Sequence, residues 1–318
     1  MSNKTNRTRP SVCASELLLH LEKHGYRGRI VSIQHLPELK SHVEECRRQG
    51  LFDTEFYQER LAWFDFRIPD NLPKAKSIIV VAVPRPQSRV IFTWKGERRA
   101  LILPPTYVAY KEINRQTEDL VAKFLNLRGY HVKPTSLPLK LLAVRSGLGE
   151  YGRNNICYVQ GMGSFLQLVG VYSDLPCPKD EWREPQMMER CRHCEACRRS
   201  CPTGAVPSDR FLLRAERCIV FHNERKGDIP FPAWIDPSWH NCLFGCLHCQ
   251  RTCPEDKTLM QWIEEAEEFS EAETALLLDG VSRDQLSAAT AKKLEHLNLS
   301  EDLACLPRNL GVFLKKKT

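Results

Sequence analysis

"CRHCEACRRSCPTG", residues 191–204, contains four cysteines separated by two, two and three residues, and a proline follows the last one. This is the spacing of bacterial iron–sulfur proteins with two clusters, in which three thiolates bind one cluster and the fourth binds the other. Zinc also binds C-x2-C pairs, but four cysteines in such a short run ending in Cys-Pro favour iron–sulfur clusters. The stretch therefore predicts a second group of ligands elsewhere in the chain.

That second group lies at 245–256, in "GCLHCQRTCPED", where Cys246, Cys249 and Cys253 again precede a proline. It lacks a leading cysteine, because position 243 is leucine, and both Cys218 and Cys242 are candidates for the missing ligand. Two four-iron clusters need eight thiolates. The sequence therefore predicts two clusters, with one cysteine to spare.

The composition is that of an ordinary globular protein of 318 residues, with 42% hydrophobic and 27% charged residues. The polar, basic beginning "MSNKTNRTRP" is not a secretory signal, and no apolar stretch is long enough to cross a membrane. We therefore expect a cytoplasmic protein, in which the fourteen cysteines serve metal or redox chemistry rather than disulfides. The net charge of +7 weakly favours an anionic partner.

Periodicity predicts both helices and strands before the cysteines. Helical spacing occurs in 15–26, 38–49 and 107–128, whereas the runs 77–83 and 166–172 are typical of buried strands. This mixture predicts an α+β fold. The predicted division is a disordered N-terminus at 1–12, a first domain at 13–180, a cluster domain at 181–258, and a helical C-terminal extension at 259–318.

Two segments upstream of the cysteines, together with the cysteine pattern, resemble epoxyqueuosine reductases. They are "LPKAKSIIVVAVP" (72–84) and "VRSGLGEYGRNNICYVQGMGSFLQLVGVYSDLPCP" (144–178). The same segments are similar, more distantly, to the corrinoid reductive dehalogenases. Both resemblances imply a nitroreductase-like α/β sandwich that holds cobalamin, followed by a ferredoxin-like domain with two [4Fe–4S] clusters.

The resemblance also implies the ligands of each group. One cluster takes Cys191, Cys194, Cys197 and Cys253, and the other takes Cys201, Cys218, Cys246 and Cys249. Cys242 is then the spare thiol. The residues implied to bind cobalamin are Gly147, Gly149, Arg153, Asn154, Asn155, Cys157 and His248.

The implied activity is a reduction. A low-potential donor of the ferredoxin or flavodoxin type supplies electrons to the clusters, which pass them to the corrinoid cofactor. In epoxyqueuosine reductases the substrate is an epoxide on a modified base of the tRNA anticodon, so the resemblance implies a role in queuosine biosynthesis and tRNA processing. The partner would be tRNA, held by arginines on its phosphates.

The sequence departs from the family pattern at the expected proton donor. The family has an aspartate upstream of its Gly-Leu-Gly segment, whereas residues 131–149 contain neither Asp nor Glu, and only Thr135 and Ser136 lie near the expected place. A hydroxyl of this kind is a poor general acid at neutral pH. Tyr151, Tyr107 and Tyr110 are the alternatives, and Tyr151 leads because it lies inside the resembling segment.

Three functions remain open from the sequence. The first is a cobalamin-dependent reductase of the epoxyqueuosine reductase type, and the second is a corrinoid reductase of a small molecule, like the dehalogenases. The third is a two-cluster electron-transfer protein without cobalamin. The long domain before the cysteines favours an enzyme, because a carrier needs only the clusters. The missing aspartate favours the carrier, or a related protein with other chemistry.

Overall fold

The structure, a computed structural model, describes residues 8–315 and divides into two compact units. The first unit comprises Met1–Pro84 and Glu112–Cys194, and the second comprises Arg85–Lys111 and Glu195–Thr318. The units are therefore interleaved along the sequence. A strand pair from the first third of the chain belongs with the C-terminal residues, which sequence periodicity does not reveal.

The first unit is built on a four-stranded antiparallel sheet in the order β1-β2-β8-β5. Its strands are β1 (Arg27–Ser32), β2 (Ser77–Pro84), β8 (Leu166–Ser173) and β5 (Val132–Pro134). The predicted strands at 77–83 and 166–172 are confirmed as β2 and β8, which pair along their whole length. Their β-branched residues suit a buried, pleated surface.

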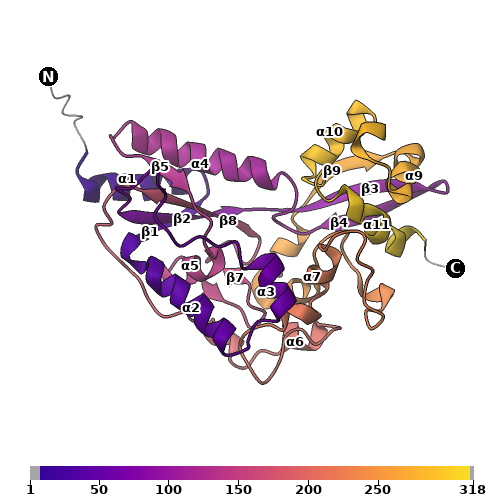
Figure 1. Ribbon diagram of the computed structural model, residues 1–318, viewed down its shortest axis with the longest axis horizontal. Helices are drawn as coiled ribbons and strands as arrows, with labels where there is room; N and C mark the ends of the chain where they lie inside the picture. The colour runs from indigo at the N-terminus through magenta and orange to yellow at the C-terminus, as the bar shows by residue number, and fades with distance from the viewer. Residues whose placement is uncertain (1–7, 316–318) are drawn as a thin grey trace. The chain divides into compact units, whose positions relative to one another are not determined.

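Helices cover both faces of this sheet (Figure 1). They are α1 (Pro10–Lys23), α2 (Leu36–Arg48), α3 (Thr54–Arg60), α4 (Tyr110–Asn126) and α5 (Leu139–Arg145). Because side chains alternate along a strand, Ile79 and Val81 of β2 pack with α1 and α4, while Ile78 and Val80 pack with α2 and α5. The result is an α/β/α arrangement in which β2 is buried on both sides.

The sequence predicted that residues 1–12 are disordered, but helix α1 begins at Pro10, so residues 10–12 are helical. Proline suits the first turn of a helix, because the amide hydrogen that it lacks has no helical partner there. Residues 1–7 of that predicted segment lie outside the described residues.

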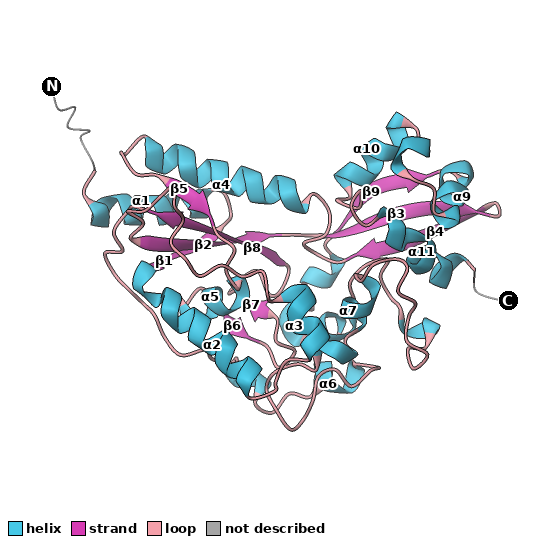
Figure 2. Cartoon of the chain, viewed as in Figure 1, coloured by secondary structure: helices cyan, strands magenta, loops and turns pink. Residues whose placement is uncertain are grey.

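The second unit contains a three-stranded sheet in the order β4-β3-β9. Its strands are β3 (Gln87–Trp94), β4 (Glu97–Leu103) and β9 (Ile263–Phe269), and its longer helices are α9 (Glu271–Asp279), α10 (Ala288–His296) and α11 (Leu306–Leu314). Figure 2 shows these helices beside the sheet. Phe92 and Phe269 stack at 4.9 Å between ring centroids, at the centre of the core that the sheet and helices share.

The prediction of a wholly helical segment at 259–318 is wrong for its first part, because Ile263–Phe269 is strand β9. Ala266 and Phe269 pack on the same core although they are three residues apart, a spacing that suggests a helix in the sequence. A β-bulge explains the spacing: the pairing with β3 shifts register between Arg89 and Ile91 and adds one residue to β9.

The cysteine-rich part of the second unit has short helices and many turns. Its helices are α6 (Ala196–Ser200), α7 (Ile219–Asn223) and α8 (His248–Arg251). Tight turns of this kind are what closely spaced thiols require. Between residues 8 and 315, no helix has the length and apolar character needed to cross a membrane.

Candidate functional site

Four cysteines of the second unit lie together although they are far apart in the sequence. Cys201 directly follows α6, Cys218 precedes α7, and Cys246 and Cys249 flank the start of α8. Burial raises the pKa of the Cys249 thiol well above its ordinary value, and the neighbouring cysteines add to this shift; they are Cys246, Cys218, Cys197 and Cys201. The packing therefore brings the four thiols predicted for one cluster into one neighbourhood.

Cys218, rather than Cys242, is the better fit for the missing ligand. The pKa of the Cys218 thiol is raised to about 12, mainly by burial and also by Cys246 and Cys201. Cys218 therefore lies close to both of these cysteines. Burial likewise raises the pKa of Cys242, but the cysteine that contributes there is Cys246. Cys242 is also 1% exposed and packs in the interior of the unit, as a spare structural thiol would.

One side chain ties the two cysteine runs together within the second unit. The Ser200 hydroxyl lies 3.2 Å from the carbonyl oxygen of Cys197 and 3.1 Å from that of His248. It also lies 3.1 Å from the hydroxyl of Thr252. Helices α6 and α8 are thus held side by side, which is the arrangement expected if each run gives a thiolate to the other's cluster.

The start of the first run belongs to the first unit, where Arg153 holds it. The Arg153 guanidinium donates to the carbonyl oxygen of Cys191 at 2.6 Å, of Cys194 at 2.9 Å and of Arg192 at 3.0 Å. Three carbonyls on one guanidinium define the shape of this loop. Arg153, predicted to bind cobalamin, therefore positions the loop that carries Cys191 and Cys194, two of the predicted cluster ligands.

The thiols of the second unit fit an iron–sulfur cluster by their chemistry. Thiolate is the ligand that such clusters prefer, and the second unit brings together four thiols on partly exposed residues. Among residues 8–315, no three His, Cys, Asp or Glu side chains are placed to hold a single metal ion. Cluster ligands need not meet at one point, because each thiolate of a cubane binds its own iron. The first cluster's ligand set is divided between the two units, and its assignment stays a prediction.

The glycines of the Gly-Leu-Gly segment are explained by contacts within the first unit. Gly147 has a φ of +73°, which glycine adopts without strain. A Cβ atom on Gly149 would lie 2.5 Å from the carbonyl oxygen of Tyr158 and 2.8 Å from the sulfur of Cys157. Arg183 also donates to the carbonyl of Gly149 at 3.2 Å. Backbone conformation therefore favours glycine at Gly147, and close packing requires it at Gly149.

The other residues predicted to bind cobalamin also contact the protein itself. The Asn154 amide donates to the hydroxyl of Tyr158 at 3.0 Å, and Asn155 takes a φ of +57° in the turn before β7 (Cys157–Tyr158). Cys157 is 2% exposed. In the second unit, Nε2 of His248 donates to the carbonyl of Trp239 at 2.9 Å. In this structure these residues bond to the protein itself, and their corrin-binding role stays a prediction.

We expect Cys157 to resist alkylation by iodoacetamide in the folded, iron-loaded protein at pH 8. Burial raises the pKa of its thiol to about 12, so only about one thiol in ten thousand is the reactive thiolate at that pH. Reactivity should rise only as the pH approaches that value. Mass spectrometry of the Cys157 peptide measures the label, and protein in concentrated urea is the positive control. Rapid labelling of the folded protein would instead place this thiol on an accessible pocket wall.

Tyr151 lies on β6 (Glu150–Tyr151), which pairs with β7. Its backbone amide donates to the carbonyl of Gln186 at 2.8 Å, and its own carbonyl accepts from Met188 at 2.9 Å. Burial is the main cause that raises the pKa of the Tyr151 phenol, and Cys157 and Cys46 add to it. The phenol is therefore protonated at neutral pH, in a half-buried place at the edge of the core.

The other candidate donors lie in different surroundings. The Tyr107 hydroxyl, in the second unit, donates to the carboxylate of Glu224, and burial raises its pKa well above the usual value. Tyr110 is exposed at the start of α4. The hydroxyl of Thr135 packs against Gly170 of β8, where a Cβ atom would approach it to 2.6 Å.

A carboxylate does lie near the turn that lacks the expected aspartate, and the sequence pattern missed it. The amide of Asp65 donates to the carbonyl of Ser136 at 3.0 Å, although seventy-one residues separate them in the chain. Hydrogen bonds from the Arg67 side chain and amide lower the pKa of Asp65 to about 2. Asp65 is thus ionised at neutral pH and cannot donate a proton while the ion pair persists.

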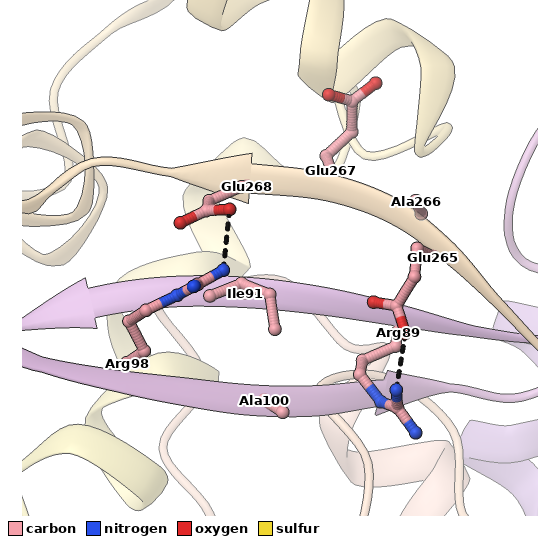
Figure 3. Close-up of a pocket in the computed structure, with 8 residues that line it drawn as sticks. All are labelled: Arg89, Ile91, Arg98, Ala100, Glu265, Ala266, Glu267 and Glu268. Atoms are coloured by element: carbon pink, nitrogen blue, oxygen red, sulfur yellow. Dashed lines mark hydrogen bonds and ion pairs between the residues drawn. The ribbon is translucent and has the colours of Figure 1, made fainter.

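A groove of about 790 Å³ lies on the open face of the second unit's sheet. Figure 3 shows that cross-strand ion pairs occupy it: Arg89 pairs with Glu265, and Arg98 pairs with Glu268 at 2.8 Å. Because these charges neutralise one another, the groove offers no concentrated charge of either sign. The predicted site residues are not among those that line it.

Comparison with known proteins agrees with the cysteine pattern. Residues 190–256 match the family described as a 4Fe-4S double cluster binding domain. The epoxyqueuosine reductase of Bacillus subtilis (strain 168) is 30% identical over 229 residues, which are 65% of this chain and 57% of that protein. The resemblance to epoxyqueuosine reductases is confirmed. The chain spans about half the length of the curated relatives it matches.

Two further comparisons define the extent of the likeness. The tetrachloroethene reductive dehalogenase of Dehalobacter restrictus is 29% identical over 150 residues, covering 44% of this chain and 27% of that protein. A solved epoxyqueuosine reductase, in complex with an epoxyqueuosine-modified tRNA-Tyr stem loop, aligns with a TM-score of 0.66 at 22% identity, over 96% of this chain and 81% of that chain. The chain therefore shares the fold of epoxyqueuosine reductases, and its cysteine-rich part is a double-cluster domain.

Proposed function

We propose that this chain is an iron–sulfur oxidoreductase of the epoxyqueuosine reductase type, acting on epoxyqueuosine in tRNA. The observation that supports this most is the meeting of Cys201, Cys218, Cys246 and Cys249 within the matched double-cluster domain. The first unit would be the nitroreductase-like substrate domain, and the cysteine-rich part would be ferredoxin-like. A cytoplasmic location is part of the proposal.

The reaction determines what the chain must supply. Removing an epoxide oxygen as water consumes two electrons and two protons. The clusters would carry the electrons one at a time from a ferredoxin- or flavodoxin-type donor. Cobalamin, when bound, would supply a cobalt centre able to hold low oxidation states. Tyr151 is the proposed proton donor, because its phenol is protonated at neutral pH and residues 131–149 offer no carboxylate.

The proposed activity is tested with anaerobically reconstituted protein, cobalamin, a low-potential reductant and an anticodon stem-loop that carries epoxyqueuosine. The expected result is the loss of one oxygen atom from the modified base, which mass spectrometry measures. A spectrum of added cobalamin, recorded with and without protein, reports corrin binding separately. No conversion by protein that holds both clusters and binds corrin would reject this substrate.

A second candidate is a two-cluster electron-transfer protein without cobalamin. It is favoured by the internal contacts of Arg153, Asn154 and the Gly-Leu-Gly glycines, which account for those residues without a corrin. An unchanged cobalamin spectrum in the presence of protein, together with reversible reduction of both clusters, would support it.

If tRNA is the substrate, binding of the stem-loop should weaken steeply with salt. We expect about a 100-fold loss of affinity between 50 and 200 mM salt if about four phosphates are contacted. Arg199 and Arg217, which are exposed beside the cluster cysteines, are the proposed contacts. Their double replacement by alanine should reduce the salt slope by about two. Arg283→Ala, which removes another exposed arginine of the same unit, is the matched control. Salt-independent binding would argue for a small-molecule substrate.

A further inference from the structure

The turn that leads into Cys246 is held at the backbone amide and carbonyl of both Leu243 and Gly245. The amide of Leu243 donates to the carbonyl of Ile102 in β4 at 3.0 Å. The Asn223 side chain donates to the carbonyl of Gly245 at 2.7 Å and accepts from its amide at 3.1 Å. Gly245 is the residue immediately before a predicted cluster ligand, so this two-point contact determines where the Cys246 thiol lies.

Little freedom remains at Gly245 itself. Its φ is +71°, and a Cβ atom there would approach the hydroxyl of Tyr107 to 2.6 Å and Pro104 to 2.8 Å. The side chains of Pro104 and Tyr107, which follow β4, therefore pack against one side of Gly245, and Asn223 bonds to its backbone. Any displacement of Asn223 would be transmitted directly to the turn.

Asn309 of helix α11 holds Asn223 in turn. Its amide nitrogen donates to the carbonyl of Asn223 at 2.8 Å and to the carbonyl of Leu243 at 3.1 Å. Asn309 is 1% exposed and Asn223 is fully buried, so water cannot replace these bonds. The Asn309 side chain thereby bonds to Asn223, which holds Gly245, and to Leu243, which begins the turn.

The neighbouring residue of α11 reinforces the same place. The Arg308 guanidinium donates to four carbonyl oxygens, one at the end of α7 and three in the segment that follows; they belong to Asn223, Arg225, Lys226 and Ile229. Its Nε atom also donates to the side-chain oxygen of Asn309 at 3.1 Å. This bond orients the Asn309 amide so that its nitrogen faces the two carbonyls.

We infer that Asn309 is a positioning residue for the cluster bound by Cys218, Cys246 and their partners, and that helix α11 takes part in assembling that centre. This inference rests on the proposed ligand assignment but not on the substrate. Cys218 lies just before α7 and Cys246 just after the turn, so Asn223, between them in the network, links two ligands of one cluster. The C-terminal segment is then part of the metal centre's scaffold.

The inference predicts a selective loss of iron. Asn309→Leu keeps the size of the side chain but leaves two buried carbonyls and the Arg308 contact unsatisfied. After anaerobic reconstitution, we expect iron and sulfide to fall from about eight to about four per chain. The electron paramagnetic resonance spectrum of the reduced protein should retain the signal of the other cluster. Asn309→Ser, which keeps one donor, should lose less iron and serves if the leucine variant does not fold.

Thr290→Val is the matched control. Thr290 is 1% exposed in the same C-terminal segment, and its hydroxyl donates to Glu273 at 2.9 Å, away from the cysteine turn. It should lower the melting temperature but keep about eight irons. Equal iron loss in Thr290→Val and the Asn309 variants, or full iron with an unchanged spectrum in the Asn309 variants, would overturn the inference. Unsubstituted protein that holds about eight irons but does not act on tRNA would count against the proposed function alone.

Discussion

Cys218→Ser is expected to lose about half of the iron of the reconstituted protein, from about eight to about four irons per chain, while Cys242→Ser keeps all of it. The difference follows from where the two thiols lie. Cys218 interacts with both Cys246 and Cys201, whereas the cysteine beside Cys242 is Cys246. A serine hydroxyl is a much weaker ligand than a thiolate, so removing a true ligand should open the cluster.

Iron and sulfide analysis, together with the spectrum of the reduced protein, measures this result. Both variants replace a buried sulfur by oxygen in the same unit, so each controls for the destabilising effect of the substitution on the other. Electron transfer through the remaining cluster should fail in Cys218→Ser, and turnover should be lost. If Cys242→Ser lost about four irons and Cys218→Ser lost none, the two assignments would have to be exchanged.

Tyr151→Phe is expected to lower turnover by about 10²- to 10⁴-fold, the usual contribution of a general acid, while both clusters remain. Burial raises the pKa of the phenol, so it carries its proton throughout the neutral range. It can release that proton only when negative charge develops beside it during the reaction. The rate should therefore stay flat between pH 6 and 8, because the phenol does not titrate there.

Two variants test whether the effect belongs to the Tyr151 hydroxyl. Tyr158→Phe removes a phenol from the neighbouring strand, where the hydroxyl accepts from Asn154, and it should cost stability but little turnover. Asp65→Asn removes the carboxylate of the residue bonded to Ser136, which is ionised because the pKa of Asp65 is held at about 2. Wild-type turnover in Tyr151→Phe would show that its ring only packs. A loss confined to Asp65→Asn would show that the Arg67 ion pair opens during the reaction.

Local spacing predicted the elements whose geometry is local. The cysteine runs at 191–204 and 245–256 indicated two clusters because their spacing is typical of iron–sulfur proteins with two clusters. The β-branched run 77–83 indicated a buried strand, and β2 is buried on both faces. In these cases the pattern lies within about a dozen neighbouring residues, so the sequence alone is enough to predict the element.

The sequence was misleading where a distant partner changed the local pattern. The segment 259–318 was predicted to be helical, but pairing with β3 and a bulge made Ile263–Phe269 a strand. Arg153 and the Gly-Leu-Gly glycines suggested a cofactor pocket. In the folded chain, the arginine holds the Cys191–Cys194 loop, Gly147 takes a positive φ, and Gly149 accommodates close packing.

By itself, then, the sequence indicated a double-cluster domain and the two central strands of the main sheet, β2 and β8, because these depend on residue chemistry and short-range spacing. Only the tertiary structure decided that Cys218 lies among its partner thiols, that Asp65 approaches Ser136, and that Asn309 supports the turn before Cys246. Each of these joins residues separated by long stretches of chain. Such contacts form only when packing of the hydrophobic cores offsets the entropy of closing the loops between them.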